Sequence, residues 1–370
     1  MGLAPRDQSR STSVGVGAMA HDAQRLRFDL AGFARDGTLG DHAALMRLVE
    51  RADAQGYGGI WFNEFHFRRA GLPYPHLPLL GAEILGRTQR LRFGTSILVL
   101  PLHHPLMLAE QIAQLDFQSG GRVDVGIGRG TEPATFDRLG IDPGTARDRF
   151  DEALTVMLRA WTEPRVTSDG PVWPFAETEV GPPPVQRPHP PVFVAGVSEG
   201  TVAVAARHGF PLLLSLEPNE ARQLPVFRDA LRRFGAGPGP MAASSLSRYV
   251  LPAPTEAAAM AALDRLTEVL NARRAARAAE RGQPPAPPRD RAAMLKGFAI
   301  AGTPKACRQQ IEALIDRTGC RNLRCFFDAN GLIPMPQAEA AMTLFATEVM
   351  PAFEGYRVPP VPDLLAGAEN

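Results

Sequence analysis

The residues of this sequence that could do chemistry stand in short polar stretches at the ends of apolar runs. The first stretch is WFNEFHF (61–67), in which Glu64 and His66 stand two positions apart between aromatic residues. On an extended chain these two side chains share one face, and an imidazole beside a carboxylate can transfer protons near neutral pH. An equally good interpretation is that His66 only bonds Glu64 and steadies the end of a buried strand.

Two adjacent histidines, His103 and His104, follow the next apolar run. Neighbouring residues of a strand point to opposite faces, so the pair does not easily bind one metal ion. No carboxylate or cysteine stands at ligand spacing, and we therefore expect no metal site. We expect one of the pair to line a cavity and take His104, with His66, as a candidate for proton transfer.

GIGRG (126–130) stands between a predicted strand and a helix, but it is not a dinucleotide fingerprint, because Thr131 occupies the position of the third glycine. Its glycines alone indicate a tight turn. Arg129 is different, because a guanidinium at the end of a strand suits a phosphate group.

GVSEG (196–200) fits the nucleophile motif of hydrolases, with Ser198 as the nucleophile. That motif requires an acid and then a histidine later in the chain. Only His208 follows Ser198, and no aspartate stands between them, so the triad cannot form in this order. Instead, Ser198 and Thr201 lie where a helix begins, a place that attracts anions, and with Arg129 they would form a phosphate cradle.

These polar stretches are positioned by a repeated pattern of short apolar runs and longer amphipathic segments, which is typical of βα units around a parallel sheet. The predicted strands are 25–33, 58–67, 91–101, 122–128, 190–196, 211–216, 243–253 and 321–329. The predicted helices are 41–57, 77–90, 105–118, 146–162, 201–209, 219–234, 255–280 and 336–350. The pattern predicts an α/β fold, a (β/α)₈ barrel, rather than a doubly wound sheet.

Two insertions interrupt the pattern, at 163–189 after the fourth unit and at 281–300 after the seventh. We expect residues 23–356 to form the barrel, residues 1–22 to be a disordered extension with Met19 as a candidate start, and 357–370 to be a tail.

The composition argues for a protein that binds neither nucleic acid nor a membrane. The 370 residues carry 40 Lys and Arg against 39 Asp and Glu, a net charge of +1, so they give no electrostatic signal for a polyanion. No apolar run approaches the roughly 18 residues of a spanning helix. The three cysteines have no metal-site spacing, and we expect a reduced, cytoplasmic protein.

Several blocks in order resemble the bacterial luciferase-like monooxygenases. The family pattern E-H-H-F, then G-T-x-x-x-x-L-P-x-x-H-P, then A-E-x-x-x-x-L-D-x-x-S-x-G-R, then G-x-G-R-G corresponds to four segments here. They are NEFHF (63–67), GTSILVLPLHHP (94–105), AEQIAQLDFQSGGR (109–122) and GIGRG (126–130), followed by matching blocks at 183–209 and 301–314. The resemblance covers nearly the whole chain.

The resemblance implies a barrel, usually dimeric as a homodimer or a heterodimer with a paralogue, that binds reduced FMN supplied by a separate flavin reductase. The flavin reacts with O₂ to a C4a-hydroperoxide, which oxygenates a small organic substrate such as an aldehyde, a ketone or a natural-product intermediate. The matching FMN-phosphate ligands are Arg129, Ser198 and Thr201, and Gly130 and Val197 are further cofactor-binding positions.

Two further positions carry over from the family. Ser96 and Ile97 would form a bulge under the flavin ring, with a cis peptide between them. In the E-H-H-F block, the first histidine is the catalytic residue of the luciferases, and here that position is Phe65. His66 matches the second histidine, so His66 or His104, with Glu64, would have to manage protons instead.

Two alternatives share this fold. One is an F420-dependent oxidoreductase that transfers hydride without O₂, and the other is a flavin-binding partner subunit without catalysis, which Phe65 makes conceivable. The substrate is not readable from the sequence, because specificity in barrels lies in loops that vary freely.

Overall fold

The computed structural model describes residues 25–33, 42–68, 74–130, 132–217 and 219–359. The predicted N-terminal extension, residues 1–22, lies outside the described residues, as does most of the predicted tail. Among the described residues, no helix is long and apolar enough to cross a bilayer.

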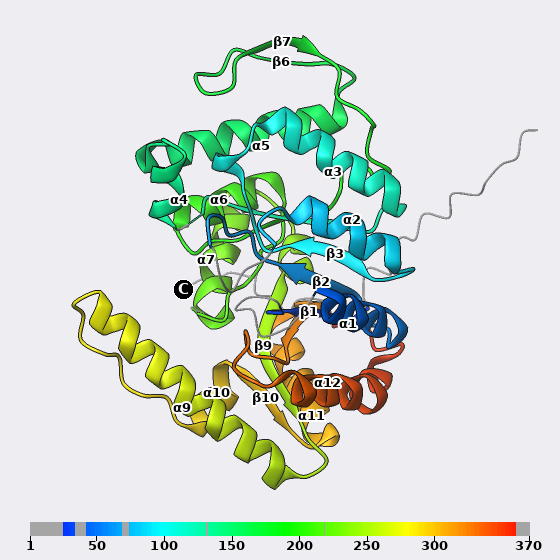
Figure 1. The fold of residues 1–370 in the computed structure, drawn as a ribbon, viewed down its shortest axis with the longest axis vertical. Helices are drawn as coiled ribbons and strands as arrows, with labels where there is room; N and C mark the ends of the chain where they lie inside the picture. Colours follow the sequence, from blue (N-terminus) through cyan, green and yellow to red (C-terminus); the bar gives the residue numbers. More distant parts are fainter. Residues whose placement is uncertain (1–24, 34–41, 69–73, 131, 218, 360–370) are drawn as a thin grey trace, which may run out of the picture.

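Parallel strands form the wall of a barrel (Figure 1). They are β1 (Arg27–Ala31), β2 (Gly59–Phe62), β3 (Arg92–Thr95), β4 (Leu98–Val99), β5 (Val123–Gly128), β8 (Val192–Val194), β9 (Ser245–Pro252), β10 (Ala299–Gly302) and β11 (Asn322–Phe326). The sheet order is β10-β9-β11-β1-β2-β3-β5-β4, with β8 paired to β5. Between β8 and β9, the segment around Leu212 contributes only single bridges, from Val194 to Leu212 and from Leu213 to Ser245.

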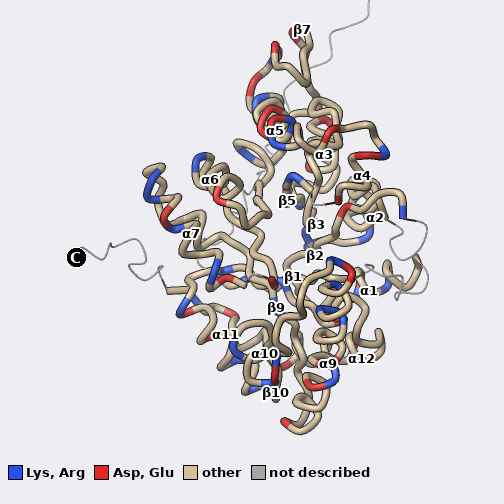
Figure 2. Tube along the Cα trace, turned by 90° about the vertical axis from the view of Figure 1, so that its left-hand side faces the viewer, with Lys and Arg blue, Asp and Glu red and all other residues tan. Residues whose placement is uncertain are grey.

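Helices cover the outside of this wall, since each apolar stripe must be buried against the sheet. They are α1 (His42–Ala54), α2 (Leu77–Arg87), α3 (Pro105–Ser119), α4 (Pro133–Arg138), α5 (Ala146–Thr162), α6 (Glu199–His208), α7 (Glu220–Arg233), α8 (Gly239–Ala243), α9 (Glu256–Glu280), α10 (Arg291–Gly297), α11 (Pro304–Thr318) and α12 (Met335–Leu344). Short helical turns occupy Leu100–Leu102, Pro143–Thr145, Phe345–Val349 and Met350–Phe353. Figure 2 shows acidic and basic residues interspersed along these helices, as the small net charge leads one to expect.

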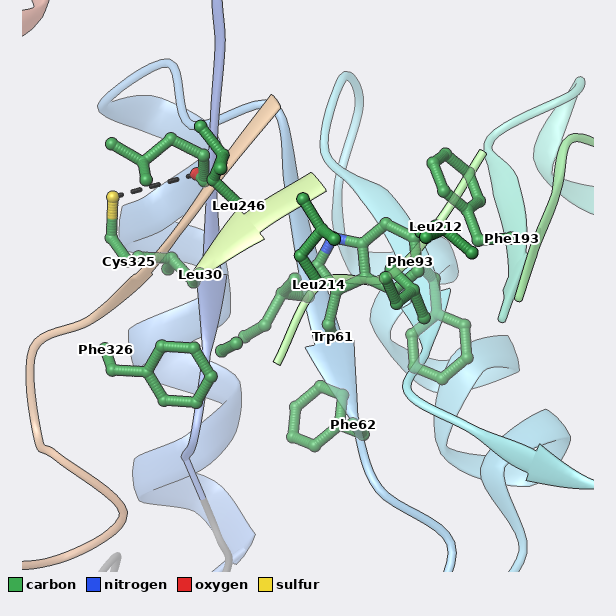
Figure 3. Close-up of a cluster of buried hydrophobic side chains, with 14 of the residues drawn as sticks. Leu30, Trp61, Phe62, Phe93, Phe193, Leu212, Leu214, Leu246, Cys325 and Phe326 are labelled. Carbon is green, nitrogen blue, oxygen red and sulfur yellow. Dashed lines mark hydrogen bonds between the residues drawn. The ribbon is translucent and has the colours of Figure 1, made fainter. Parts of the chain in front are cut away.

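Buried aromatic and branched side chains pack on both faces of the barrel strands (Figure 3). Trp61 and Phe193 meet edge to face with ring centroids 5.2 Å apart, and Phe62 stacks on Phe93. Leu212 and Leu214, from the predicted sixth strand (211–216), belong to the same cluster. These side chains form a packed core, so the open part of the barrel is confined to its mouth.

Two predicted strands differ from expectation. The third, expected over 91–101, is broken at Ser96–Ile97 into β3 and β4 and ends in a helical turn. The sixth, expected over 211–216, pairs with its neighbours only at Leu212 and Leu213.

The first insertion is a two-stranded hairpin, β6 (Val166–Ser168) and β7 (Phe175–Thr178), which lies at the top of Figure 1. Its return segment is held by the buried carboxylate of Asp116, which accepts hydrogen bonds from the backbone N–H groups of Val185 and Gln186 at 2.7 and 3.0 Å. At the hairpin, Glu152 accepts the N–H groups of Val172 and Trp173. The insertion is therefore fixed to the barrel at both places.

A buried charge network closes the barrel near the starts of β1, β3 and β5. Asp124 pairs with Arg92 and Arg27, each at 2.7 Å, and Arg27 also pairs with Asp29. Burial alone would raise the pKa of Asp124, but the two guanidinium groups hold it well below its usual range. These pairs stabilise the end of the barrel opposite the mouth.

Candidate active site

A cavity of about 810 Å³ lies at the carboxyl ends of the barrel strands, where barrel enzymes place their active sites. Its lining includes Glu64 and His66 after β2, Ser96 and Ile97 at the break of the third strand, and Arg129 after β5. The structure thus brings candidate residues from distant segments of the chain together around one cavity.

Glu64 is the centre of a small hydrogen-bond network. Its Oε1 accepts the Nε2–H groups of His66 at 2.5 Å and His103 at 2.7 Å, and its Oε2 accepts the backbone N–H of Val99 at 2.7 Å. Strand β2 ends at Phe62, before this stretch. Glu64 and His66 nevertheless meet, as predicted for a chain that continues to alternate.

The Glu64 side chain is 1% exposed. Burial alone would raise its pKa, but the bonds from His103 and His66 lower it to about 2. Glu64 is therefore a fixed negative charge near neutral pH. In the neutral form, each imidazole donates from Nε2 and keeps Nδ1 as a proton acceptor.

The structure corrects the choice between the two adjacent histidines. His103 joins the Glu64 network, whereas His104 is exposed and its ring packs against Trp173 of the insertion, with centroids 5.1 Å apart. The reason is the helical turn at Leu100–Leu102, which ends the strand alternation before the histidines.

A carboxylate does lie near the histidines, contrary to what the sequence spacing indicated. One ligand atom from each of Glu64, His66 and His103 lies within 4.8 Å of the others. The carboxylate that the sequence spacing did not show is supplied by a neighbouring strand end. In this arrangement the three groups satisfy one another by hydrogen bonds.

Phe65 lies on the cavity wall, half-buried. The guanidinium of Arg68 lies 5.3 Å from its ring centroid. Where the luciferase pattern has an imidazole, this chain thus presents an apolar face.

The structure brings the three residues of the predicted phosphate cradle into contact. Ser198 is the N-cap of α6; its Oγ lies 2.9 Å from the Thr201 hydroxyl and accepts a bond from Arg129 Nη2 at 3.1 Å. No bond joins Ser198 to an imidazole among the described residues, so the hydrolase interpretation finds no support. Among the residues that the structure describes, no carboxylate lies at ion-pair distance from Arg129.

Gly130 and Val197 flank the cradle, and both line the cavity. Gly130 has φ 77°, and a Cβ there would lie 2.6 Å from Val99 Cγ1. A larger residue would strain the loop that orients Arg129. Val197 is 52% exposed, which leaves an apolar side chain at the mouth.

The peptide bond between Ser96 and Ile97 is cis, as predicted. Beneath it lies Arg324 of β11, which the sequence argument missed. Its side chain donates to Ser96 Oγ at 2.9 Å and to the carbonyl of Leu214 at 2.8 Å. Arg324 is buried, which lowers its pKa to about 10, and the influence of Asp29 only partly compensates. The only signal in the sequence was an arginine within an apolar strand.

The sequence profile of the luciferase-like monooxygenase family matches residues 18–322. The chain belongs to this family. Membership confirms the expectation of an oxidoreductase, and it accounts for the order of the blocks that surround the cavity.

Relatives of this luciferase-like protein include flavin enzymes from several bacteria. It is 28% identical over 340 residues to an alkanal monooxygenase alpha chain of the Kryptophanaron alfredi symbiont, covering 83% of this chain and 91% of that one. It is 32% identical over 168 residues to the oxygenase component of a flavin-dependent trigonelline monooxygenase from Acinetobacter baylyi (strain ATCC 33305 / BD413 / ADP1). That match covers 45% of this chain and 46% of the relative, about half of its length.

Solved structures of low sequence identity share the fold. The oxygenating constituent of 3,6-diketocamphane monooxygenase from Pseudomonas putida, in complex with FMN, superposes with a TM-score of 0.70 at 21% identity, covering 88% of this chain and 98% of that one. The F420-dependent tetrahydromethanopterin reductase of Methanopyrus kandleri gives 0.66 at 19%, covering 90% and 99%. At these identities the likeness shows the fold alone, and it confirms the barrel.

Proposed function

We propose that this protein is the oxygenase component of a two-component monooxygenase, which takes reduced FMN from a separate flavin reductase and oxygenates a small organic substrate with O₂. The observation that carries the proposal is the Arg129–Ser198 cradle opening into the same cavity as the Glu64 network. An anion site and a proton-handling site in one cavity are what a phosphorylated redox cofactor and its chemistry require.

The residues present fit FMN. The cradle combines an arginine without a carboxylate partner among the described residues, two hydroxyl groups and the N-terminus of the ten-residue helix α6. Such a combination binds a phosphate dianion by charge-assisted bonds. The cavity volume of about 810 Å³ lies within the usual range of cofactor sites.

When bound, the reduced flavin supplies the electrons and activates O₂. His66 holds a proton at Nε2 toward Glu64 and offers Nδ1 as an acceptor, so it can accept a proton from a reacting group. The Glu64 charge stabilises the imidazolium that forms. His103 bonds the same oxygen and thereby positions Glu64, while Phe65 keeps water away from the reacting atoms.

We further propose a dimer through helices α2 and α3. These neighbouring helices expose three large apolar side chains, Leu79 at 73%, Met107 at 55% and Phe117 at 61%. Apolar residues that are so exposed are typical of an interface between subunits.

The three free, buried cysteines fit a reducing, cytoplasmic location.

The test is an anaerobic titration of the protein with reduced FMN and, separately, with reduced F420, followed by admission of O₂. We expect tight binding of reduced FMN and oxygen consumption that depends on the protein. Binding of F420 alone, with no O₂ uptake, would establish the deazaflavin alternative. Binding of FMN with peroxide release as fast as from free flavin would establish the non-catalytic subunit.

A further inference from the structure

The cavity contains more positive charge than FMN needs. Five arginines line it, and none has a carboxylate at ion-pair distance among the described residues. They are Arg129, Arg273, Arg274, Arg277 and Arg324.

The acidic residues of the same lining are already satisfied. Glu64 binds two imidazoles, Glu132 pairs with Arg68, and Glu217 pairs with Arg289. Glu132 and Glu217 are therefore neutralised by other arginines, and the single negative charge of Glu64 leaves most of the positive charge of the five lining arginines unbalanced.

Three of the five arginines come from α9, which runs along the lower left of the molecule in Figure 1 and packs on β9 and β10. Arg273 and Arg277 are exposed and stand at i and i+4, a spacing at which like charges destabilise a helix. Arg274 between them is half-buried and makes only long contacts, at 3.3 Å or more, to Asn271 and the carbonyl of Pro287.

The helix dipole explains only part of this arrangement. Cations in the last turn of a helix are favourable, which covers Arg277. Arg273 and Arg274 lie further back along α9, where the dipole has little effect, and they face the cavity without a counter-ion from the described chain.

A single FMN cannot account for all five charges. Its phosphate carries about two negative charges and is assigned to Arg129 and α6. Even a negative charge on the reduced ring would occupy only the buried Arg324. The three arginines of α9 remain.

We propose, on the basis of the proposed function, that α9 binds a carboxylate of the substrate and that the protein oxygenates an acidic small molecule with an apolar body. Arg273, Arg274 and Arg277 hold the acid group at the mouth by charge-assisted bonds. Leu270 of the same helix and Leu332 also line the cavity and provide apolar contacts for the rest of the molecule.

The experiment compares octanoate with the neutral octanamide by calorimetric titration into the FMN-loaded protein at low ionic strength. We expect octanoate to bind at least tenfold more tightly than octanamide. The double variant R273Q/R277Q should lose this preference and keep wild-type affinity for reduced FMN. Arg265→Gln, an exposed arginine of α9 outside the cavity, is the matched control and should behave as wild type.

Each contrary result has a distinct meaning. Equal binding of the two ligands by the wild type, or equal loss in Arg265→Gln, overturns the substrate site. The tail of F420 also carries carboxylates, so F420 is titrated beside its tail-less chromophore. If the double variant weakens F420 but not the chromophore, the arginines serve that cofactor's tail and the substrate assignment is wrong. Failure of FMN to bind the wild type would contradict the proposed function instead, and octanoate titrated without flavin would still test α9.

Discussion

Arg129 is the residue on which cofactor binding most depends in the proposed function. Arg129→Ala removes the one cation of the cradle, and we expect reduced FMN to bind more weakly by about 1.5–3 kcal/mol. Ser198→Ala should cost less, because the α6 backbone N–H groups remain. Anaerobic titration measures both, and unchanged affinity in Arg129→Ala would refute the assignment.

Ser198 also provides a check on the hydrolase motif. Its Oγ bonds an arginine and a threonine rather than an imidazole. We expect no covalent labelling by a serine-directed phosphonate, as judged by intact-mass spectrometry.

Proton handling in the cavity should depend on His66 and not on His104. His66→Ala removes the imidazole that contacts both Glu64 and the cavity, and we expect coupled oxygenation to fall by about 10²-fold, with faster release of hydrogen peroxide. His104→Ala should resemble the wild type, because that ring packs on Trp173 at the surface. Rapid mixing of the reduced-FMN complex with O₂ measures both, and equal behaviour of the two variants would contradict the role of His66.

Glu64 links the site to stability. The pKa of Glu64 is depressed in the folded state, from 4.5 to about 2. The contribution of Glu64 to the free energy of unfolding is therefore complete above pH 4.5 and disappears as the pH falls toward 2. We expect Glu64→Gln to lower the free energy of unfolding at pH 7 by up to about 3 kcal/mol. The difference from the wild type should stay constant between pH 7 and 5 and shrink below 4.5, as measured by urea unfolding. A difference that grows toward acid would exclude this origin.

At the scale of elements, the carboxylate of Asp116 ties the first insertion to α3. Asp116→Ala would leave the N–H groups of Val185 and Gln186 without their buried acceptor. We expect a loss of about 3 kcal/mol in the free energy of unfolding. Glu110→Ala, on the same helix, should change it by less than about 0.5 kcal/mol. Similar effects of the two changes would mean that the insertion is held otherwise.

The elements that the sequence predicted best were long and amphipathic. The helix expected over 146–162 has these bounds in the structure, because seventeen residues display an apolar stripe clearly. β10 and α11 were not predicted as a unit, since the four-residue strand is too short to show a period. Sequence alternation correctly joined Glu64 and His66 but could not show that a helical turn precedes His103 and turns it, rather than His104, toward them.

At the scale of the whole molecule, the exposed apolar residues of α2 and α3 predict the oligomeric state. We expect the wild type to have twice the 39.9 kDa chain mass in light scattering after size-exclusion chromatography. M107D/F117D should elute as a single chain, because each aspartate would be buried unpaired at the interface. Val226→Asp, at an exposed apolar position on α7, should remain dimeric. A monomeric wild type would end the proposal.

The cradle and α9 come from separate stretches of the chain, since Arg129, Ser198 and Thr201 all precede residue 202 and α9 begins at Glu256. Mutations can therefore accumulate on α9 without disturbing the contacts that retain the cofactor. In evolutionary terms, a lineage could exchange one substrate for another by drift in a single helix, while selection on flavin retention acts elsewhere. Homologues would then be expected to diverge fastest on the cavity face of α9.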